Sequence, residues 1–166
     1  MGADKQIVEV RQEDRGEYFQ SLQVRNIEDG FQWELVNTYG PVQDEKKEEY
    51  LQELGGKIKE CGWPMIIGGD FNLVRRVEEK SSGNVDVRFM VAFNDMIDDT
   101  ELLKLHRGGS RYTWTNKQVD PIQSVLDRVL VNNNWEDKYP LVRVTSITRI
   151  GSNHNPLIVD TCAEVR

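Results

Sequence analysis

The stretch Met65–Asn72, MIIGGDFN, constrains the fold of this chain more than any other. Three apolar residues, two of them β-branched, predict a short buried strand that ends where two glycines let the backbone turn. The turn delivers Asp70 and Asn72 to the carboxyl end of the strand, where ligands bind in open α/β sheets. A carboxylate beside an amide suits the handling of a water near a phosphate. An Asx-rich turn without a chemical role is the alternative.

Length and composition favour a single globular domain over residues 1–166, because 38% of the residues are hydrophobic and 30% are charged. The net charge of -7 disfavours general binding of nucleic acid unless a basic face or a metal compensates. Cys61 and Cys162 fit no zinc spacing, so we expect reduced thiols and a cytoplasmic or nuclear location, with one disulfide as the alternative. No apolar run reaches membrane-spanning length, and we expect no membrane partner.

The pattern of apolar residues predicts strands and two helices. Strands are expected over residues 6–10, 18–27, 31–38, 65–67, 111–115, 124–131, 141–147 and 157–159, with the polar residues 12–16 separating the first two. In the third of these, Trp33 and Leu35 should alternate with polar Glu34 on a half-buried strand. One helix is expected from an Asp44 cap to Cys61. A second follows an Asp86 cap and should bury a stripe of five residues, Phe89, Ala92, Phe93, Met96 and Ile97.

Further polar side chains lie in places that suit chemistry. Asp127 sits within an apolar strand, where a carboxylate is costly unless it is paired. His154 lies in the turn 151–156, and a buried Asp on a neighbouring strand can orient and charge an imidazole. Tyr39 ends a strand at the rim, where packing is the alternative to catalysis. His106 is expected to be a surface residue without a role.

Five blocks of sequence, taken in order, resemble the endonuclease/exonuclease/phosphatase family. They are residues 36–41 (VNTYGP), 69–72 (GDFN), 111–116 (RYTWTN), 126–131 (LDRVLV) and 151–157 (GSNHNPL). The closest likeness is to the endonuclease-like domains of plant LINE-type (non-LTR) retrotransposons. The resemblance implies an α/β (α+β) sandwich of two mixed β-sheets with outer helices, shortened at its N-terminus. Members of the family cut phosphodiesters or phosphomonoesters with magnesium.

The resemblance also implies residue roles. Asp70 would align or deprotonate the attacking water, and Asn72 and Tyr39 would contact the phosphate. His154, held by Asp127, would stabilise charge that grows on the phosphoryl oxygens. Tyr112 and Trp114 match the aromatic strand near the nucleic-acid face, with core packing as the alternative for one of them. The basic residues Arg75 and Arg76 are the remaining candidates for contact with nucleic acid.

Three departures from the family pattern weaken the expected metal site. In the family, two strands that bear the metal-binding Asn and Glu precede the first of these blocks, and this chain is expected to start after them. Glu13 lies too close to Tyr39 in sequence to replace that Glu. Asn153 stands where the family has Asp, so it is at best a weak metal ligand. Val42 stands where the wider family often has a phosphate-contacting Asn.

These departures predict a catalytically degenerate domain that works through protein contact. An exposed sheet edge should pair with another protein or with a second copy of the chain. No cofactor is expected, or Mg²⁺ if the site is active. A magnesium-dependent phosphodiesterase or endonuclease is the alternative function, and binding to nucleic acid without cleavage is a third, disfavoured by the net charge.

Overall fold

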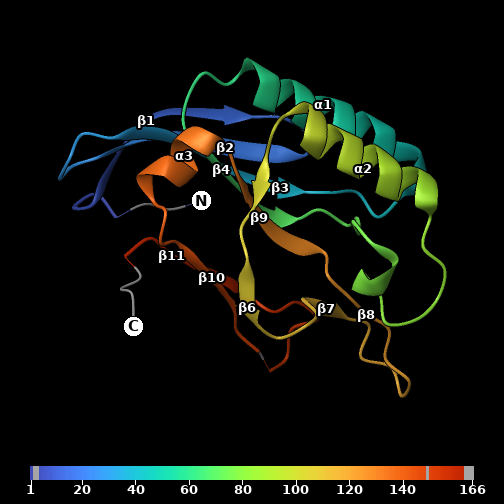
Figure 1. Ribbon diagram of the computed structural model, residues 1–166. Helices are drawn as coiled ribbons and strands as arrows, with labels where there is room; N and C mark the ends of the chain where they lie inside the picture. The colour runs from blue at the N-terminus through green and yellow to red at the C-terminus, as the bar shows by residue number, and fades with distance from the viewer. Residues whose placement is uncertain (2–3, 149, 163–166) are drawn as a thin grey trace.

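The computed structural model describes residues 1, 4–148 and 150–162. Its largest element is a six-stranded mixed sheet in the order β1-β2-β3-β4-β9-β5 (Figure 1). The strands are β1 (Val8–Arg15), β2 (Phe19–Asn26), β3 (Gln32–Tyr39), β4 (Met65–Asp70), β5 (Leu103–Lys104) and β9 (Asp127–Val131). β4 is parallel to β3 and antiparallel to β9, so the strand predicted from Met65 to Ile67 lies inside the sheet.

Two helices cover one face of this sheet, α1 (Lys47–Glu60) and α2 (Val87–Asp99), which lie side by side in Figure 1. Short 3-10 turns, η1 (Asp44–Lys46) and η2 (Val77–Glu79), precede them. The core between helices and sheet is closely packed, since Tyr50, Leu54, Phe71 and Phe93 are all fully buried. The rings of Phe71 and Phe93 lie 5.3 Å apart between their centroids.

A smaller layer covers part of the other face. It contains the mixed sheet β11-β10-β6, the hairpin β7-β8 and the short helix α3 (Figure 1). Their bounds are β6 (Arg107–Gly109), β7 (Trp114–Thr115), β8 (Gln123–Ser124), α3 (Asn133–Lys138), β10 (Arg143–Ser146) and β11 (Leu157–Asp160). A second apolar cluster, centred on Ile66, Val131 and Trp135, joins this layer to the large sheet.

The predicted fold class, two mixed sheets with outer helices, is confirmed. Several local predictions were wrong. The polar stretch 12–16 does not separate two strands, because Gln12 to Arg15 pair with β2 as part of β1. Asp44 caps no helix, and its carboxylate instead accepts a hydrogen bond from Lys47 Nζ at 2.7 Å. Asp86 does cap α2, through the N–H of Arg88.

Glu34 also departs from the expected alternation, because it is 1% exposed. Its carboxylate meets Lys57 Nζ at 2.6 Å and accepts from the Cys61 thiol at 3.0 Å, which offsets the cost of burial. Burial, with Glu34 as neighbour, raises the pKa of Cys61 to about 11, and this thiol is free, as is that of Cys162. Ala92 is exposed rather than part of the α2 stripe. In the part of the chain that the structure describes, no helix has the length and apolarity to cross a bilayer.

Candidate active site

At the end of β4, Asp70 and Asn72 are positioned by two positive backbone φ angles, one at Gly69 and one at Asn72. Glycine and asparagine adopt such angles at lower cost than other residues. Gly69 has φ +147° and lies so close to β3 that a Cβ there would stand 2.0 Å from the Thr38 carbonyl oxygen. Asn72 adopts φ +49°, which Asn tolerates better than most residues. Its N–H donates to Asp70 Oδ1 at 2.8 Å, and its side-chain amide donates to the Gly40 carbonyl at 2.7 Å. Both side chains are therefore fixed by backbone contacts.

Asp70, Asp127 and His154 meet at one place. β4 and β9 are antiparallel neighbours that pair Asp70 with Asp127, so both carboxylates lie at the same end of the large sheet. His154 Nδ1 lies 3.0 Å from Asp127 Oδ2, and its Nε2 lies 3.7 Å from Asp70 Oδ2. Asp127 therefore orients the imidazole and leaves Nε2 to face Asp70. The sequence predicted that a buried Asp on a neighbouring strand orients His154, and in the structure Asp127 lies within hydrogen-bond distance of its ring.

Burial raises the pKa of Asp70 above its usual value of 3.8, and the negative charge of Asp127 acts in the same direction. The N–H of Asn72 and the imidazole of His154 oppose this shift because they favour the carboxylate. A carboxylate with a raised pKa is a stronger base for a proton of water. An oriented imidazole beside it can donate to, or carry charge opposite, an anionic oxygen.

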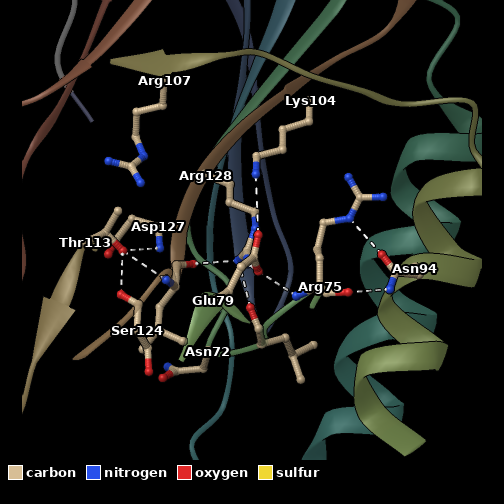
Figure 2. A network of polar contacts seen from close by, with 12 residues as sticks. Asn72, Arg75, Glu79, Asn94, Lys104, Arg107, Thr113, Ser124, Asp127 and Arg128 are labelled. Carbon is tan, nitrogen blue, oxygen red and sulfur yellow. Dashed lines mark hydrogen bonds and ion pairs between the residues drawn. The ribbon is translucent and has the colours of Figure 1, made fainter. Parts of the chain in front are cut away.

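Thr113 ties these elements together, and the sequence did not single it out. Its fully buried hydroxyl oxygen accepts the N–H groups of Leu126 at 2.9 Å and Asp127 at 3.0 Å, next to Ser124 (Figure 2). Its backbone carbonyl accepts the N–H of Asn155 at 2.8 Å, on the turn that bears His154. One residue thus holds both Asp127 and the His154 turn. The sequence feature that could have indicated this role is a small polar residue, Thr113, between the aromatic residues Tyr112 and Trp114.

The other expected site residues are placed less centrally. Tyr39 ends β3 opposite Asp70 and is 62% exposed, so its hydroxyl is accessible at the rim of the site. The backbone of Trp114 forms an isolated antiparallel β-bridge with that of His154. The side chains of Trp114 and Tyr112 are both half-buried. Arg76 is exposed. Arg75 is held by Asn94, to which its Nε donates at 2.7 Å, so its guanidinium is committed to a contact within the protein.

A second polar cluster, centred on Arg128 and Glu79, lies on the other side of β9. The sequence analysis did not predict it. Arg128, 2% exposed, pairs with Glu79 and donates to the Leu73 carbonyl at 2.7 Å. Glu79 also accepts from the N–H of Arg75 at 2.7 Å and lies 3.4 Å from Lys104 Nζ (Figure 2). The guanidinium of Arg128 stands over the Phe93 ring. The cluster fixes the loop after β4 to β9 and through it supports Asp127.

The described residues at the site offer few free ligand groups for a magnesium ion. Within residues 1, 4–148 and 150–162, no group of three or more His, Cys, Asp or Glu side chains is arranged to hold a metal. Asp127 is engaged with His154, and one oxygen of Asp70 is taken by the Asn72 N–H. Asn153 is exposed, and its backbone carbonyl accepts from Thr115. Mg²⁺ in proteins is bound by one or two carboxylates and completes its octahedral shell with waters, so the second oxygen of Asp70 is the ligand that these contacts leave most available.

A groove of about 480 Å³ runs from the site between the two sheets, and we call it the inter-sheet groove. Its apolar part is formed by Leu35, Val129, Leu157 and Val159, and Met1 also lines it. At the site end, its polar lining is Asn37, Asp127, Ser152 and His154. The candidate site therefore opens into a cleft whose floor is the large sheet and whose wall is β11.

The carboxylates of Asp70 and Asp127 and the imidazole of His154 thus lie together at one end of a two-sheet α/β sandwich, beside the inter-sheet groove. The chain belongs to the family described as endonuclease-reverse transcriptase, which matches residues 33–158. The resemblance to the endonuclease/exonuclease/phosphatase family is thereby confirmed at the level of family and fold. No match is found among curated protein sequences.

Solved structures share the fold at low identity. The endonuclease domain of TRAS1, a telomere-specific non-LTR retrotransposon, is 19% identical with a TM-score of 0.67, over 89% of this chain and 65% of that one. A Bacteroides thetaiotaomicron endonuclease/exonuclease/phosphatase family protein is 14% identical with a TM-score of 0.63, over 93% and 65%. TDP2 of D. rerio, complexed with a single-strand DNA product, is 15% identical with a TM-score of 0.57, over 91% and 65%. The chain thus spans about 65% of these neighbours.

Proposed function

We propose that this chain is a nuclease-fold domain that keeps the hydrolytic half of a phosphodiester-cleaving site and lacks the metal-binding half. On this proposal residues 1–166 do not cleave by themselves, and the domain acts through contact with protein. One observation carries the proposal. Asp70, Asp127 and His154 are assembled, yet neither these three nor any other three His, Cys, Asp or Glu side chains among the described residues are arranged to hold a metal. Loss of Lewis-acid stabilisation worth several kcal/mol slows a reaction by roughly a thousandfold or more.

The finer origin of the domain is also proposed. The five sequence blocks, in the order in which plant LINE-type retrotransposons have them, support descent from such an element. A cytoplasmic or nuclear location is consistent with two free cysteines. Exposed sheet edges support pairing with a protein partner or with a second copy. Light scattering of the purified chain tests self-association, and a dimer or larger species is the positive result.

A cleavage assay tests the absence of activity. Nicked, abasic and supercoiled DNA are incubated with Mg²⁺ or Mn²⁺ and either the wild-type chain or His154→Ala. We expect equal background cleavage by both proteins. His106→Ala is the matched control, because His106 is exposed and lies outside the site. Cleavage that is lost in His154→Ala and kept in His106→Ala would overturn the proposal.

A magnesium-dependent phosphodiesterase is the second candidate, favoured by the oriented imidazole and by the raised pKa of Asp70. Asn153→Asp discriminates the two, because it returns a carboxylate to the exposed turn beside His154. Higher activity in this variant would indicate that a metal site is otherwise complete. Salt-dependent DNA binding without cleavage would favour a nucleic-acid-binding role through residues such as Arg76 or Trp114.

A further inference from the structure

We infer that the groove between α1 and α2 docks a basic amphipathic α-helix of a partner protein. The inference rests on the proposed role in protein contact, and it names a surface and a partner chemistry for that contact. Figure 1 shows the two helices side by side on the outside of the large sheet. The groove between them has a volume of about 720 Å³, and we call it the inter-helix groove. Its apolar lining is formed by Leu51, Gly55, Gly56, Phe89, Ala92 and Met96.

The two helices run in the same direction, so both of their carboxyl ends lie at one end of the inter-helix groove. In their first turns, Lys47 Nζ lies 5.1 Å from the centroid of the Phe89 ring. Further along, a Cβ on Gly55 would lie 3.4 Å from Met96 Cγ. A helix carries a partial negative charge at its carboxyl end. The two partial charges therefore add at the same end of the groove.

Acidic side chains make this end more negative. α2 has Asp95, Asp98 and Asp99 in or next to its last turn and no basic residue there, and Lys59 is the cation that lines this end. Carboxylates at the carboxyl end of a helix are unfavourable because they lie beside the negative end of its dipole. Within the residues that the structure describes, no ion pair offsets these three carboxylates. Cationic side chains of a partner would relieve this repulsion.

Gly56 lies in the interior of α1, and the packing of the chain does not require a glycine there. Glycine destabilises the interior of a helix. A Cβ at Gly56 would meet no atom within 4 Å, whereas a Cβ at Gly55 would already contact Met96. Glycine is suited to places where another backbone or a ligand approaches closely. The open space over Gly56 therefore favours close approach of an occupant to α1.

The occupant is a helix because the inter-helix groove offers no free backbone groups. The N–H and C=O groups inside α1 and α2 bond along each helix, so an extended segment can form no ladder with them. A segment that is buried there must pair its own backbone groups, as an α-helix does. α1 has 14 residues and a length of about 21 Å, which suits an occupant of about three turns. Apolar residues at every third or fourth position of that helix would face Leu51, Ala92 and Met96.

Charge favours a basic partner over a second copy of the chain. The net charge of -7 makes two copies repel one another. At its other end the groove is lined by Glu48, and the nearby Lys47 is paired with Asp44 at 2.7 Å. Arg88 likewise pairs with Asp86 at 2.7 Å. A helix with Lys or Arg beside its apolar face therefore complements both ends of the groove.

Binding of a designed peptide tests the inference. The probe is a fluorescein-labelled peptide of about 14 residues, with Leu at every third or fourth position and Lys and Ala elsewhere. We expect saturable binding in fluorescence anisotropy at about 0.15 M salt. A scrambled peptide of the same composition has no apolar face and should bind at least about tenfold more weakly. In methyl NMR spectra the signals of Leu51, Ala92 and Met96 should shift on binding, and that of the fully exposed Val119 should not.

Variants of the protein locate the contact. Gly56→Gln fills the open space in the groove and should weaken binding at least about tenfold. Because glutamine is the better helix former, the melting temperature of this variant should rise by about 1–4 °C, which verifies that it is folded. Asp95→Lys should weaken binding about fivefold. Asp120→Lys makes the same charge change in the exposed loop between β7 and β8, and this matched control should leave binding nearly unchanged.

Four results would overturn the inference: no binding of the peptide, equal binding of its scrambled form, unchanged binding in Gly56→Gln, or equal losses of binding in Asp95→Lys and Asp120→Lys. A dimer that Gly56→Gln dissociates in light scattering would also overturn it, because the groove would then belong to a second copy. The cleavage assay is independent of these results. Metal-dependent cleavage would overturn the proposed lack of activity and leave helix docking standing. A failed peptide test would remove only the helix-docking site.

Discussion

The two faces of the six-stranded sheet are packed to different degrees. On the helix-covered face Leu54, Phe71 and Phe93 are completely buried. On the opposite face Ile66 and Val131 are also buried, but Leu35 is only half-buried and borders a groove of about 480 Å³. The candidate site opens on the second face. The side chains of the candidate site thus lie where packing is less complete, and the closed face supplies the rigidity that holds them.

The largest expected effect contrasts the two faces directly. Phe93→Ala removes a fully buried ring next to Phe71 and should lower the free energy of unfolding by about 3–5 kcal/mol. Leu35→Ala on the open face should cost about 1 kcal/mol, because its side chain is already partly solvated. Urea unfolding of both variants measures the difference. Equal losses would mean that the second face is as well packed as the first.

The next effect concerns the cluster behind β9. Glu79→Gln leaves Arg128 buried without its counter-charge and should destabilise the protein by about 3 kcal/mol. Glu78→Gln is the matched control, since Glu78 is exposed and next in sequence, and should change stability by less than about 0.5 kcal/mol. Denaturant midpoints compare the pair. A small effect at Glu79 would show that the buried guanidinium is satisfied by carbonyl oxygens such as that of Leu73.

A smaller effect is expected at Thr113. Thr113→Val keeps the shape of the side chain but leaves the N–H groups of Leu126 and Asp127 without an acceptor, at a cost of about 1–3 kcal/mol. The imidazole signals of His154 in NMR spectra should shift as Asp127 moves. Thr113→Ser should restore both the stability and the spectrum. An unchanged His154 signal in Thr113→Val would limit Thr113 to a role in packing.

The smallest effect has the opposite sign. Because folding raises the pKa of Asp70, the folded chain binds its proton more tightly than the unfolded chain does, so this residue reduces stability as pH rises above 3.8. Asp70→Asn should therefore stabilise the protein slightly at neutral pH and remove this component of the pH dependence. Urea unfolding of wild type and variant at about pH 5 and pH 7 measures it. A less stable variant at neutral pH would contradict the shift.

The sequence predicted what local patterning determines. The helix ending near Cys61 and the strand at Met65 follow from periodicity and glycine, and the structure has both nearly as expected. The Asp70 and His154 blocks were recognised because their residues, and their order along the chain, match those of a family. Glu34 was expected to be an ordinary polar residue of a half-buried strand, since nothing in the alternation indicates that Lys57 and Cys61 lie across from it.

Non-local contacts account for the rest. Arg128 and Glu79 are 49 residues apart in sequence, and their pairing follows only from the way the loop after β4 returns to β9. The strand predicted over 111–115 is reduced to Trp114–Thr115, because the hairpin partner β8 has only two residues. Helix α3 was missed since six polar and aromatic residues show no helical periodicity, although Asn132 caps it and Trp135 anchors it.

Adjacent positions on β9 give the site its precision. Asp127 and Arg128 point to opposite sides of the sheet, one toward His154 and the other over Phe93. A slip of one residue would turn the guanidinium toward the imidazole and press the carboxylate against an aromatic ring. The buried contacts of Arg128 thus fix the register of β9. As long as they are kept, the carboxylate of Asp127 stays directed at His154.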